Sequence, residues 1–234
     1  MFMNDNRNHQ EGSTFDYPLY LVSDERSTGE TLAHIVREAL FGGVSIVQLR
    51  HKDNDIRAFI KRAETVKYVI DQFNLNRRVD GMGMKTHVPF IINDRVDVAL
   101  AVEADGVHLG QSDMPAVLAR QLIGEKKILG LTVETPQQLL EAQMLPVDYL
   151  GISTIFNTAT KSDTKHEWRL EGLTQAVKSS ALPLVAIGGI DEGNIARIAQ
   201  TKVGSIALVS AIFSAQDPKA ASAQLVALIK SETQ

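Results

Sequence analysis

Three polar side chains at alternating positions follow a short apolar run in the first quarter of the chain. The run Gly42–Leu49 (GGVSIVQL) is apolar and β-branched with glycines in front, which is typical of a buried strand. Residues two apart in a strand point to the same side, so Gln48, Arg50 and Lys52 project together if the extended backbone continues. Two cations and an amide donor would suit a polyanion such as a diphosphate, although Lys and Arg are also common at solvated strand ends.

Two aspartates follow other apolar runs, and together they could hold a metal ion. Asp94 comes directly after Pro89–Asn93, and Asp113 comes shortly after Gly106–Leu109. Two carboxylates can bind one hard divalent cation, for which Mg²⁺ fits best, with waters and a substrate phosphate completing the octahedron. The alternative for each aspartate is an N-cap of the helix that follows it.

Other polar groups stand after later apolar runs. The segments IGGI (187–190) and VSAI (209–212) could bind phosphate through backbone N–H groups, although a tight turn also favours glycine. Thr158, Thr160 and Lys161 offer two hydroxyls and a cation within a hydrophilic segment, which could also be a flexible loop. Thr132 offers a hydroxyl, and His108 is a candidate base or ligand or, alternatively, a core side chain.

Eight short β-rich runs alternate with eight segments of helical periodicity, and these elements must position the polar groups. The expected strands are Leu19–Ser23, Val44–Leu49, Pro89–Asn93, Gly106–Leu109, Ile128–Thr132, Tyr149–Ser153, Pro183–Ile187 and Ser205–Ser210. The expected helices are Thr31–Phe41, Ile56–Phe73, Val96–Val102, Ala116–Ile123, Pro136–Met144, Leu170–Ser179, Asn194–Ala199 and Lys219–Lys230. Helix starts are expected after Thr135, a polar cap before proline, and at Asp191.

The alternation predicts an α/β fold, and the simplest closed arrangement is a single-domain (β/α)8 TIM barrel over 18–234. The strand runs lack strict polar alternation, as expected when both faces of a sheet are buried. An open doubly wound sheet is the alternative, but no glycine-rich dinucleotide fingerprint follows the first strand. In such a barrel the active site lies at the carboxyl ends of the strands, which is where the candidate polar groups stand.

Composition excludes several other kinds of protein. The chain has 234 residues with a formal net charge of −4, so it carries no strong basic field for nucleic acid. It has no cysteine, which excludes disulfides and Cys-ligated zinc and is compatible with a cytoplasmic location. No apolar run approaches the ~20 residues that a membrane helix needs. Residues 1–17 are expected to be a disordered lead-in, and 75–89 a surface loop insertion.

Several motifs in order and spacing resemble the thiamine-phosphate synthase family. They are LYLVSD (19–24), VQLRHKD (47–53), PFIINDRVDVALAVEADGVHLGQSDMP (89–115), IFNTATK (155–161), AIGGI (186–190) and ALVSAI (207–212). The similarity extends from about Leu19 to about Ile229. It implies a TIM barrel that joins 4-amino-2-methyl-5-hydroxymethylpyrimidine diphosphate to 4-methyl-5-(2-phosphoethyl)thiazole, or its carboxylated form, giving thiamine phosphate and diphosphate with Mg²⁺. It also implies a possible homodimer.

The resemblance assigns roles to single residues. The groups that it implies for the pyrimidine diphosphate are Gln48, Arg50, Lys52, Asn93 and Lys161. The groups implied for the thiazole phosphate are Thr158, Thr160, Gly189, Val209 and Ser210, and the Mg²⁺ ligands implied are Asp94 and Asp113. Thr132 stands where the family usually has serine, so the substrate-binding hydroxyl is retained with an added methyl. Arg50, Lys52 and Lys161 are the expected catalytic cations, because they can stabilise the departing diphosphate.

Two alternative functions share parts of this pattern. A thiazole tautomerase would keep the IGGI phosphate site but could dispense with the metal and diphosphate groups. A barrel that only binds a phosphorylated metabolite would be expected to lack Asp94, Asp113 or Lys161, and all three are present. Release of diphosphate that depends on Mg²⁺ is expected only for the synthase.

Overall fold

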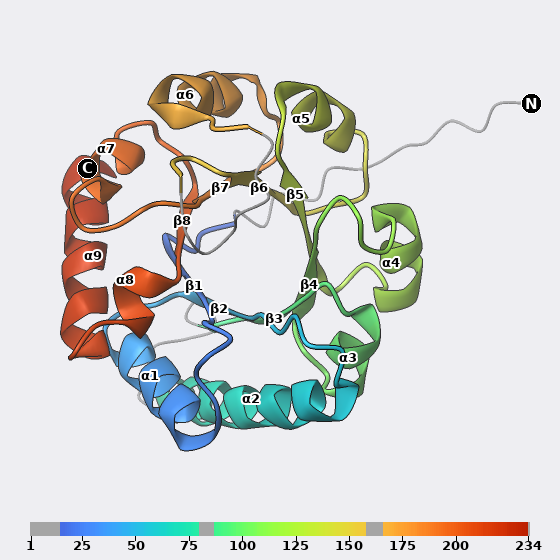
Figure 1. The fold of residues 1–234 in the computed structure, drawn as a ribbon, viewed down its shortest axis with the longest axis vertical. Coiled ribbons are helices and arrows are strands. Elements are labelled where there is room, and N and C mark those ends of the chain that lie inside the picture. The colour runs from blue at the N-terminus through green and yellow to red at the C-terminus, as the bar shows by residue number, and fades with distance from the viewer. Residues whose placement is uncertain (1–14, 80–86, 158–165, 234) are drawn as a thin grey trace, which may run out of the picture.

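Eight parallel strands close into a barrel in the computed structural model, which describes residues 15–79, 87–157 and 166–233 (Figure 1). The strands are β1 Leu19–Val22, β2 Ile46–Leu49, β3 Phe90–Asn93, β4 Gly106–Leu109, β5 Ile128–Val133, β6 Tyr149–Ser153, β7 Leu184–Ile187 and β8 Ser205–Leu208. They pair in chain order, and β8 pairs with β1 to complete the ring. The single-domain TIM barrel expected from the alternation is therefore confirmed.

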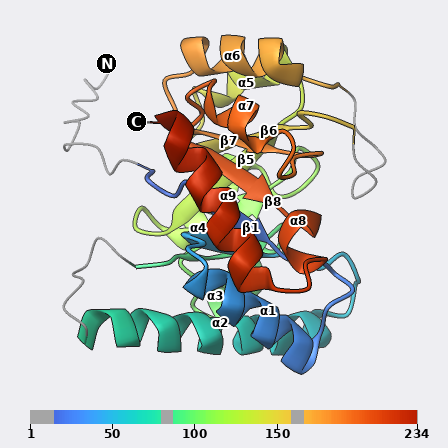
Figure 2. The same cartoon turned by 90° about the vertical axis from the view of Figure 1, so that its left-hand side faces the viewer.

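Helices surround the barrel on the outside (Figures 1 and 2). They are α1 Gly29–Phe41, α2 Ile56–Val79, α3 Val96–Ala101, α4 Ala116–Ile123, α5 Pro136–Ala142, α6 Arg169–Ser179, α7 Ile195–Ala199, α8 Ser210–Phe213 and α9 Pro218–Thr233. α9 packs against both α1 and α7 and so closes the outer ring. Because each helix returns the chain to the amino end of the next strand, the carboxyl ends of all strands meet at one end of the barrel.

The helix after β2 is longer than its periodicity predicts. α2 continues to Val79, so the part of the expected 75–89 loop from Leu75 to Val79 is helical, and that part of the prediction is wrong. Leu and Arg favour helix, and Arg77 lies 5.4 Å from the ring centroid of Phe73 one turn earlier. Residues 80–86 lie outside the described part of the chain.

The caps of two helices were expected from sequence, and one expectation is wrong. Thr135 Oγ1 accepts a hydrogen bond from the Gln138 backbone N–H at 3.2 Å, which confirms the cap of α5. The N-cap of α7 is Asn194 rather than Asp191. The Asp191 carboxylate instead accepts from the Gly193 N–H at 2.9 Å, because a turn separates it from the helix. β8 also ends earlier than expected, since α8 begins at Ser210.

Two apolar clusters hold the barrel together. The larger lies between the strands and the helices, and it includes the buried Trp168. The smaller fills the barrel interior with side chains from alternate strand positions, such as Tyr20 and Tyr149. Phe15 packs against Tyr149, with ring centroids 4.5 Å apart, and thereby joins the segment before β1 to the interior cluster.

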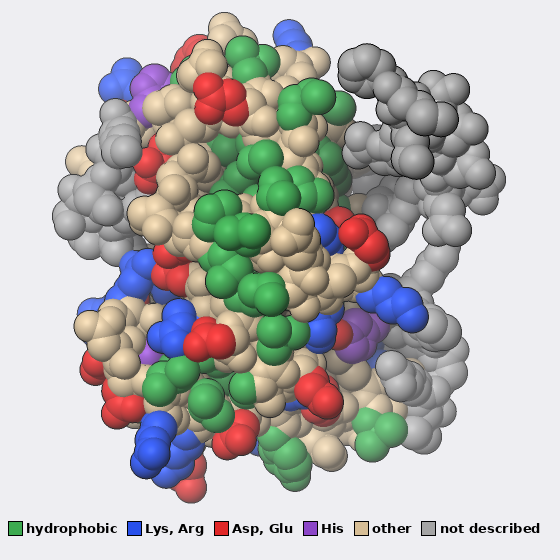
Figure 3. All heavy atoms as spheres, turned by 90° about the vertical axis from the view of Figure 1, so that its right-hand side faces the viewer, with side chains coloured by type: hydrophobic (Ala, Val, Ile, Leu, Met, Phe, Trp, Pro, Cys, Tyr) green, Lys and Arg blue, Asp and Glu red, His purple; other side chains and the backbone are tan. Residues whose placement is uncertain are grey.

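Figure 3 shows the side of the barrel that α3, α4 and α5 cover, with hydrophobic side chains running down its middle. The exposed large apolar residues of these helices and their ends are Leu100, Val117, Leu118, Leu122, Leu140 and Met144. Within residues 15–79, 87–157 and 166–233, no helix combines the length and the apolar character needed to cross a membrane.

Candidate active site

A cavity of about 670 Å³ opens at the carboxyl ends of the strands. Every sequence-predicted site residue that lies in the described part of the chain contributes to its lining: Gln48, Arg50, Lys52, Asn93, Asp94, Asp113, Thr132, Gly189, Val209 and Ser210. The fold thus brings together groups from β2, β3, β4, β5, β7 and β8 and the loops that follow them.

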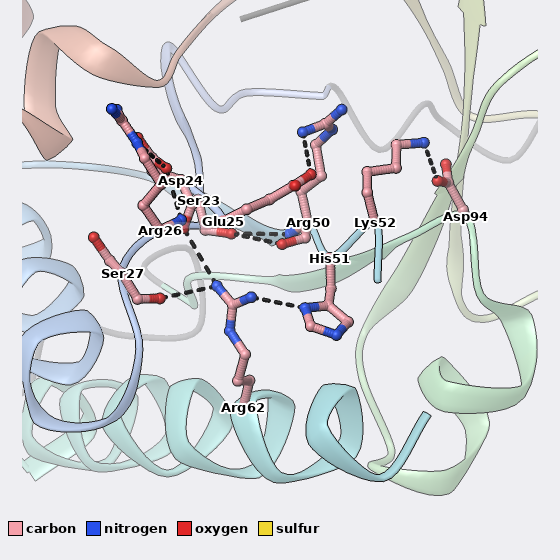
Figure 4. Close-up of polar contacts among 10 residues, drawn as sticks. All are labelled: Ser23, Asp24, Glu25, Arg26, Ser27, Arg50, His51, Lys52, Arg62 and Asp94. Carbon is pink, nitrogen blue, oxygen red and sulfur yellow. Dashed lines mark hydrogen bonds and ion pairs between the residues drawn. The ribbon is translucent and has the colours of Figure 1, made fainter. Parts of the chain in front are cut away.

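The cations after β2 each pair with a carboxylate at the mouth of the cavity (Figure 4). Arg50 forms an ion pair with Glu25 of the loop after β1. Lys52 Nζ lies 2.6 Å from Asp94 Oδ2 at the end of β3. Both pairs are partly exposed, so water and salt weaken them and an anionic ligand could replace either carboxylate.

His51 lies between Arg50 and Lys52 in the chain, points away from both of them and contacts Arg62 (Figure 4). A guanidinium nitrogen of the buried Arg62, on α2, lies 2.8 Å from His51 Nδ1. Arg62 also donates to the backbone oxygens of Ser27 at 2.9 Å and Asp24 at 3.3 Å. Burial lowers the pKa of Arg62 from its usual range, while the nearby Glu25 and Asp24 charges oppose that shift. Arg62 therefore holds both the loop after β1 and the segment after β2 that carries Arg50 and Lys52. Nothing in the sequence indicated this role.

The two candidate metal ligands lie close together. Asp94 adopts a left-handed φ of 64°, a strained conformation that Asp tolerates better than most residues. Asp113 Oδ2 accepts the Gly110 N–H at 2.6 Å. Burial raises the pKa of Asp113, and a hydrogen-bonding contact with the Asp94 carboxylate and its charge raise it further.

The alternative of helix caps for these aspartates is not seen. The N-cap residue of α3 is Arg95 and that of α4 is Pro115, and neither makes a side-chain capping bond. Two facing carboxylates repel unless a proton or a cation lies between them, so this donor set fits Mg²⁺. Among the residues that the structure describes, no third His, Cys, Asp or Glu completes a cluster, which leaves positions for water and a phosphate ligand.

The loop after β7 is built to bring backbone close to the cavity. Gly188 and Gly189 have φ values of 103° and 66°, which side chains other than glycine rarely adopt. A Cβ on Gly188 would lie 2.2 Å from Thr154 Oγ1, and a Cβ on Gly189 would lie 2.8 Å from Phe156. Asn194 Nδ2 holds the Gly189 carbonyl at 2.9 Å, which fixes the peptide orientation of this turn.

The floor of the cavity contains two tyrosines that the sequence did not single out, beside His108, for which the sequence had left a core role open. Tyr20 and Tyr149 line it together with His108, which is buried and hydrogen-bonded rather than solvent-facing. Glu134, directly after β5, also lines the cavity. The alternation of β1 could have revealed Tyr20, because Tyr20 and Val22 share one face of that strand.

A model of the family described as thiamine monophosphate synthase matches residues 19–212, which span the barrel from β1 into α8. The chain belongs to the thiamine monophosphate synthase family. It is 54% identical over 214 residues to the thiamine-phosphate synthase of Vibrio campbellii, covering 92% of this chain and 98% of the relative. It is 41% identical to the thiamine-phosphate synthase of Ruminiclostridium cellulolyticum, over 92% of this chain and 96% of the relative.

Solved structures support the same family assignment. The thiamine phosphate pyrophosphorylase of Pyrococcus furiosus superimposes with a TM-score of 0.80 at 34% identity, covering 94% of this chain and 98% of the other. A 3-hexulose-6-phosphate synthase superimposes with a TM-score of 0.61 at 17% identity, covering 89% and 98%, and this likeness shows the barrel fold alone. The family resemblance of the sequence motifs and the prediction of an enzyme are therefore confirmed.

Three predicted site residues of this family member lie outside the described residues. They are Thr158, Thr160 and Lys161. The preceding residue Asn157 lines the cavity. The roles of these three residues stay predictions.

Proposed function

We propose that this thiamine monophosphate synthase family member joins 4-amino-2-methyl-5-hydroxymethylpyrimidine diphosphate to 4-methyl-5-(2-phosphoethyl)thiazole or its carboxylated form. The products are thiamine phosphate and diphosphate, together with CO2 when the carboxylated form reacts. One observation carries the proposal: Arg50, Lys52 and the facing carboxylates of Asp94 and Asp113 line one cavity at the carboxyl ends of the strands. Cations beside a two-carboxylate site suit a diphosphate that arrives with a divalent cation.

The cations bind the diphosphate and stabilise the charge that builds up as it departs. When the substrate binds, Arg50 pairs with diphosphate oxygens in place of the Glu25 carboxylate. Lys52 likewise pairs with diphosphate oxygens in place of the Asp94 carboxylate. Lys161 supplies a third cation, as the sequence resemblance implies. Asn93 and Gln48 hold the pyrimidine diphosphate from β3 and β2.

Asp94 and Asp113 are the residues that would hold Mg²⁺. Bound there, Mg²⁺ would neutralise part of the diphosphate charge and so make it a better leaving group. Burial raises the pKa of Asp113 and the Asp94 carboxylate raises it further, and the ion would relieve this second effect.

The bond between the pyrimidine methylene carbon and the diphosphate oxygen breaks first, and its electron pair leaves with the diphosphate. The resulting pyrimidine methylene cation is attacked by the thiazole nitrogen, whose lone pair forms the new carbon–nitrogen bond. No covalent nucleophile of the protein is needed. The chain's part is to keep water away from the cation and to hold the thiazole close to it.

The second substrate is held by its phosphate. The turn with Gly189 and the segment Val209–Ser210 offer backbone N–H groups to the cavity. They follow β7 and β8, whereas the candidate metal ligands follow β3 and β4. Thr158 and Thr160 add hydroxyls, as the resemblance implies. Thr132 contributes a hydroxyl from β5 toward the pyrimidine diphosphate.

Incubation of the purified chain with both substrates, with Mg²⁺ or with EDTA, tests the proposal. Formation of thiamine phosphate and diphosphate only with Mg²⁺ is the expected result. Binding of the thiazole phosphate without coupling would favour a tautomerase instead. A homodimer and a cytoplasmic location stay predictions, and sedimentation equilibrium would test the former.

A further inference from the structure

A continuous chain of side-chain hydrogen bonds crosses the floor of the cavity. Gln48 Nε2 lies 2.8 Å from the Tyr20 hydroxyl, which lies 2.9 Å from the Tyr149 hydroxyl. The Tyr149 hydroxyl lies 2.8 Å from His108 Nδ1, and His108 Nε2 lies 2.7 Å from Thr132 Oγ1. These five side chains come from β2, β1, β6, β4 and β5. The residues at the two ends of the hydrogen-bond series, Gln48 and Thr132, are predicted substrate-binding residues.

The first donor gives the chain a direction. Gln48 Nε2 can only donate, so the Tyr20 oxygen accepts from it. Either tyrosine oxygen could donate across their 2.9 Å contact, but Tyr20 is buried, and donation to Tyr149 is the arrangement that gives its own proton an acceptor. Tyr149 in turn gives its proton to His108 Nδ1, which must then be unprotonated. Burial raises the pKa of both tyrosines above its usual range, so both stay neutral phenols with a proton to give.

The direction decides what the two ends present to a ligand. With Nδ1 accepting, the neutral imidazole of His108 carries its proton on Nε2 and donates it to Thr132 Oγ1. The Thr132 hydroxyl proton is then directed away from His108 and is available to an acceptor. At the other end, the amide of Gln48 has its nitrogen toward Tyr20, which leaves its carbonyl oxygen as the acceptor for a ligand.

Two glycines in the middle of strands make room for this arrangement. A Cβ on Gly130 would lie 2.4 Å from the Tyr149 hydroxyl and 2.5 Å from His108 Nδ1. A Cβ on Gly151 would lie 3.1 Å from His108 Cε1. Glycine weakens a strand interior, so its presence at both positions is explained by the space that the ring of His108 and the Tyr149 hydroxyl need.

We infer that Tyr20, Tyr149 and His108 are positioning residues that hold Thr132 as a hydrogen-bond donor and Gln48 as an acceptor toward the bound substrate. This inference rests on the proposed function. A ligand that fits carries a donor near β2 and an acceptor near β5, which an amino-substituted nitrogen heterocycle provides. Gly189 and Ser210, the residues proposed for the thiazole phosphate, are not part of this series of hydrogen bonds. Binding of the thiazole phosphate should therefore not depend on it.

The tautomer of His108 can be read directly. In ¹⁵N-edited spectra of the wild-type protein without substrate, the expected pattern is an unprotonated Nδ1 and a protonated Nε2. Tyr149→Phe should change that pattern, since Nδ1 loses its donor. A wild-type protein with the proton on Nδ1 would reverse the direction of the chain and overturn the inference.

Kinetics provide the second readout. Tyr149→Phe should lower kcat/KM for the pyrimidine diphosphate about tenfold, the effect of one lost hydrogen bond, and leave the KM for the thiazole phosphate within about twofold. His108→Gln keeps a donor near Thr132 and should retain most activity, whereas His108→Asn should lose it. Tyr17→Phe is the matched control, because Tyr17 packs on Phe15 outside the chain of hydrogen bonds.

The outcomes separate the inference from the proposed function. Failure of the wild type to couple the substrates would contradict the proposed function, while the ¹⁵N spectrum would still test the direction of the chain. Equal kinetics for His108→Gln and His108→Asn, or equal losses for both substrates in Tyr149→Phe, would reduce these residues to core packing and overturn the inference. If Tyr149→Phe does not fold, the wild-type spectrum and Tyr20→Phe decide.

Discussion

Lys52 Nζ lies 2.6 Å from Asp94 Oδ2, so an ion pair joins the loop after β2 to the end of β3. The Asp94 side chain is 16% exposed and also faces Asp113. Asp94 is thus attracted by the positive charge of Lys52 and repelled by the negative charge of Asp113. Loss of Asp94 would disturb the diphosphate side of the cavity without touching Gly189 or Ser210.

Asp94→Ala is expected to lower turnover about a hundredfold or more, because the charge on the departing diphosphate loses its stabilising cation. Binding of the thiazole phosphate, measured by calorimetry, should stay nearly unchanged. Asp97→Asn is the matched control, since Asp97 lies on α3 and pairs with Arg95 at the surface. Normal turnover of Asp94→Ala with Mg²⁺ would show that the metal assignment is wrong.

The Arg50–Glu25 pair predicts an effect on substrate affinity. Glu25→Gln removes the carboxylate that competes with diphosphate for Arg50, so the KM for the pyrimidine diphosphate should fall about two- to fivefold, as a partly exposed pair allows. Glu30→Gln in the first turn of α1 is the control. A raised KM in Glu25→Gln would mean that Glu25 orients Arg50 rather than competing for it.

Ser210→Asp tests the phosphate side of the cavity. A carboxylate placed beside the thiazole phosphate should raise its KM at least about tenfold by like-charge repulsion. The KM for the pyrimidine diphosphate should change much less. Ser214→Asp introduces the same charge at the end of α8, on an exposed residue outside the cavity lining. An unchanged KM in Ser210→Asp would remove Ser210 from the phosphate site.

Arg62 predicts a link between stability and substrate binding. Arg62→Ala leaves the Ser27 and Asp24 carbonyls and His51 without their donor, which should cost about 2–3 kcal/mol in the free energy of unfolding. The KM for the pyrimidine diphosphate should also rise, because the loops that carry Arg50 and Glu25 lose their anchor.

Urea denaturation measures the first effect of Arg62→Ala and steady-state kinetics the second. Arg57→Ala, exposed on the same helix, should change neither. A stability loss with an unchanged KM would confine Arg62 to a structural role.

The raised pKa of Asp113 predicts a trade-off between stability and activity. Between the ordinary carboxyl pKa and the raised value, the folded state binds more protons than the unfolded state, so stability falls as pH rises through that window. Asp113→Asn should therefore raise Tm by a few degrees at neutral pH, with a smaller gain below the ordinary pKa, while turnover is lost.

For Asp97 the expected dependence of stability on pH has the opposite sign to that for Asp113. The Arg95 hydrogen bond lowers the pKa of Asp97, so its ionised form is favoured by folding and Asp97→Asn should not stabilise. Thermal scans at several pH values without Mg²⁺ check both variants. A Tm for Asp113→Asn that falls at neutral pH would contradict the assignment of repulsion between Asp113 and Asp94.

The amino-acid sequence alone determined the fold class and part of the cavity lining. Strand and helix periods are local properties, so the alternation predicted the barrel, and the carboxyl ends of β2 and β3 predicted where Arg50, Lys52 and Asp94 meet. Whether either aspartate capped a helix was open, because the same residue types serve both purposes.

Only the tertiary structure decided which distant side chains touch. Arg62 lies on a helix whose periodicity gave no reason to pair it with His51, and nothing local connects Tyr20 to Tyr149 across the barrel. These contacts depend on the register between strands and on the packing of α2, which closure of the barrel sets. Sequence patterns report the direction of a side chain from its own element, but its partner is chosen by how the elements pack.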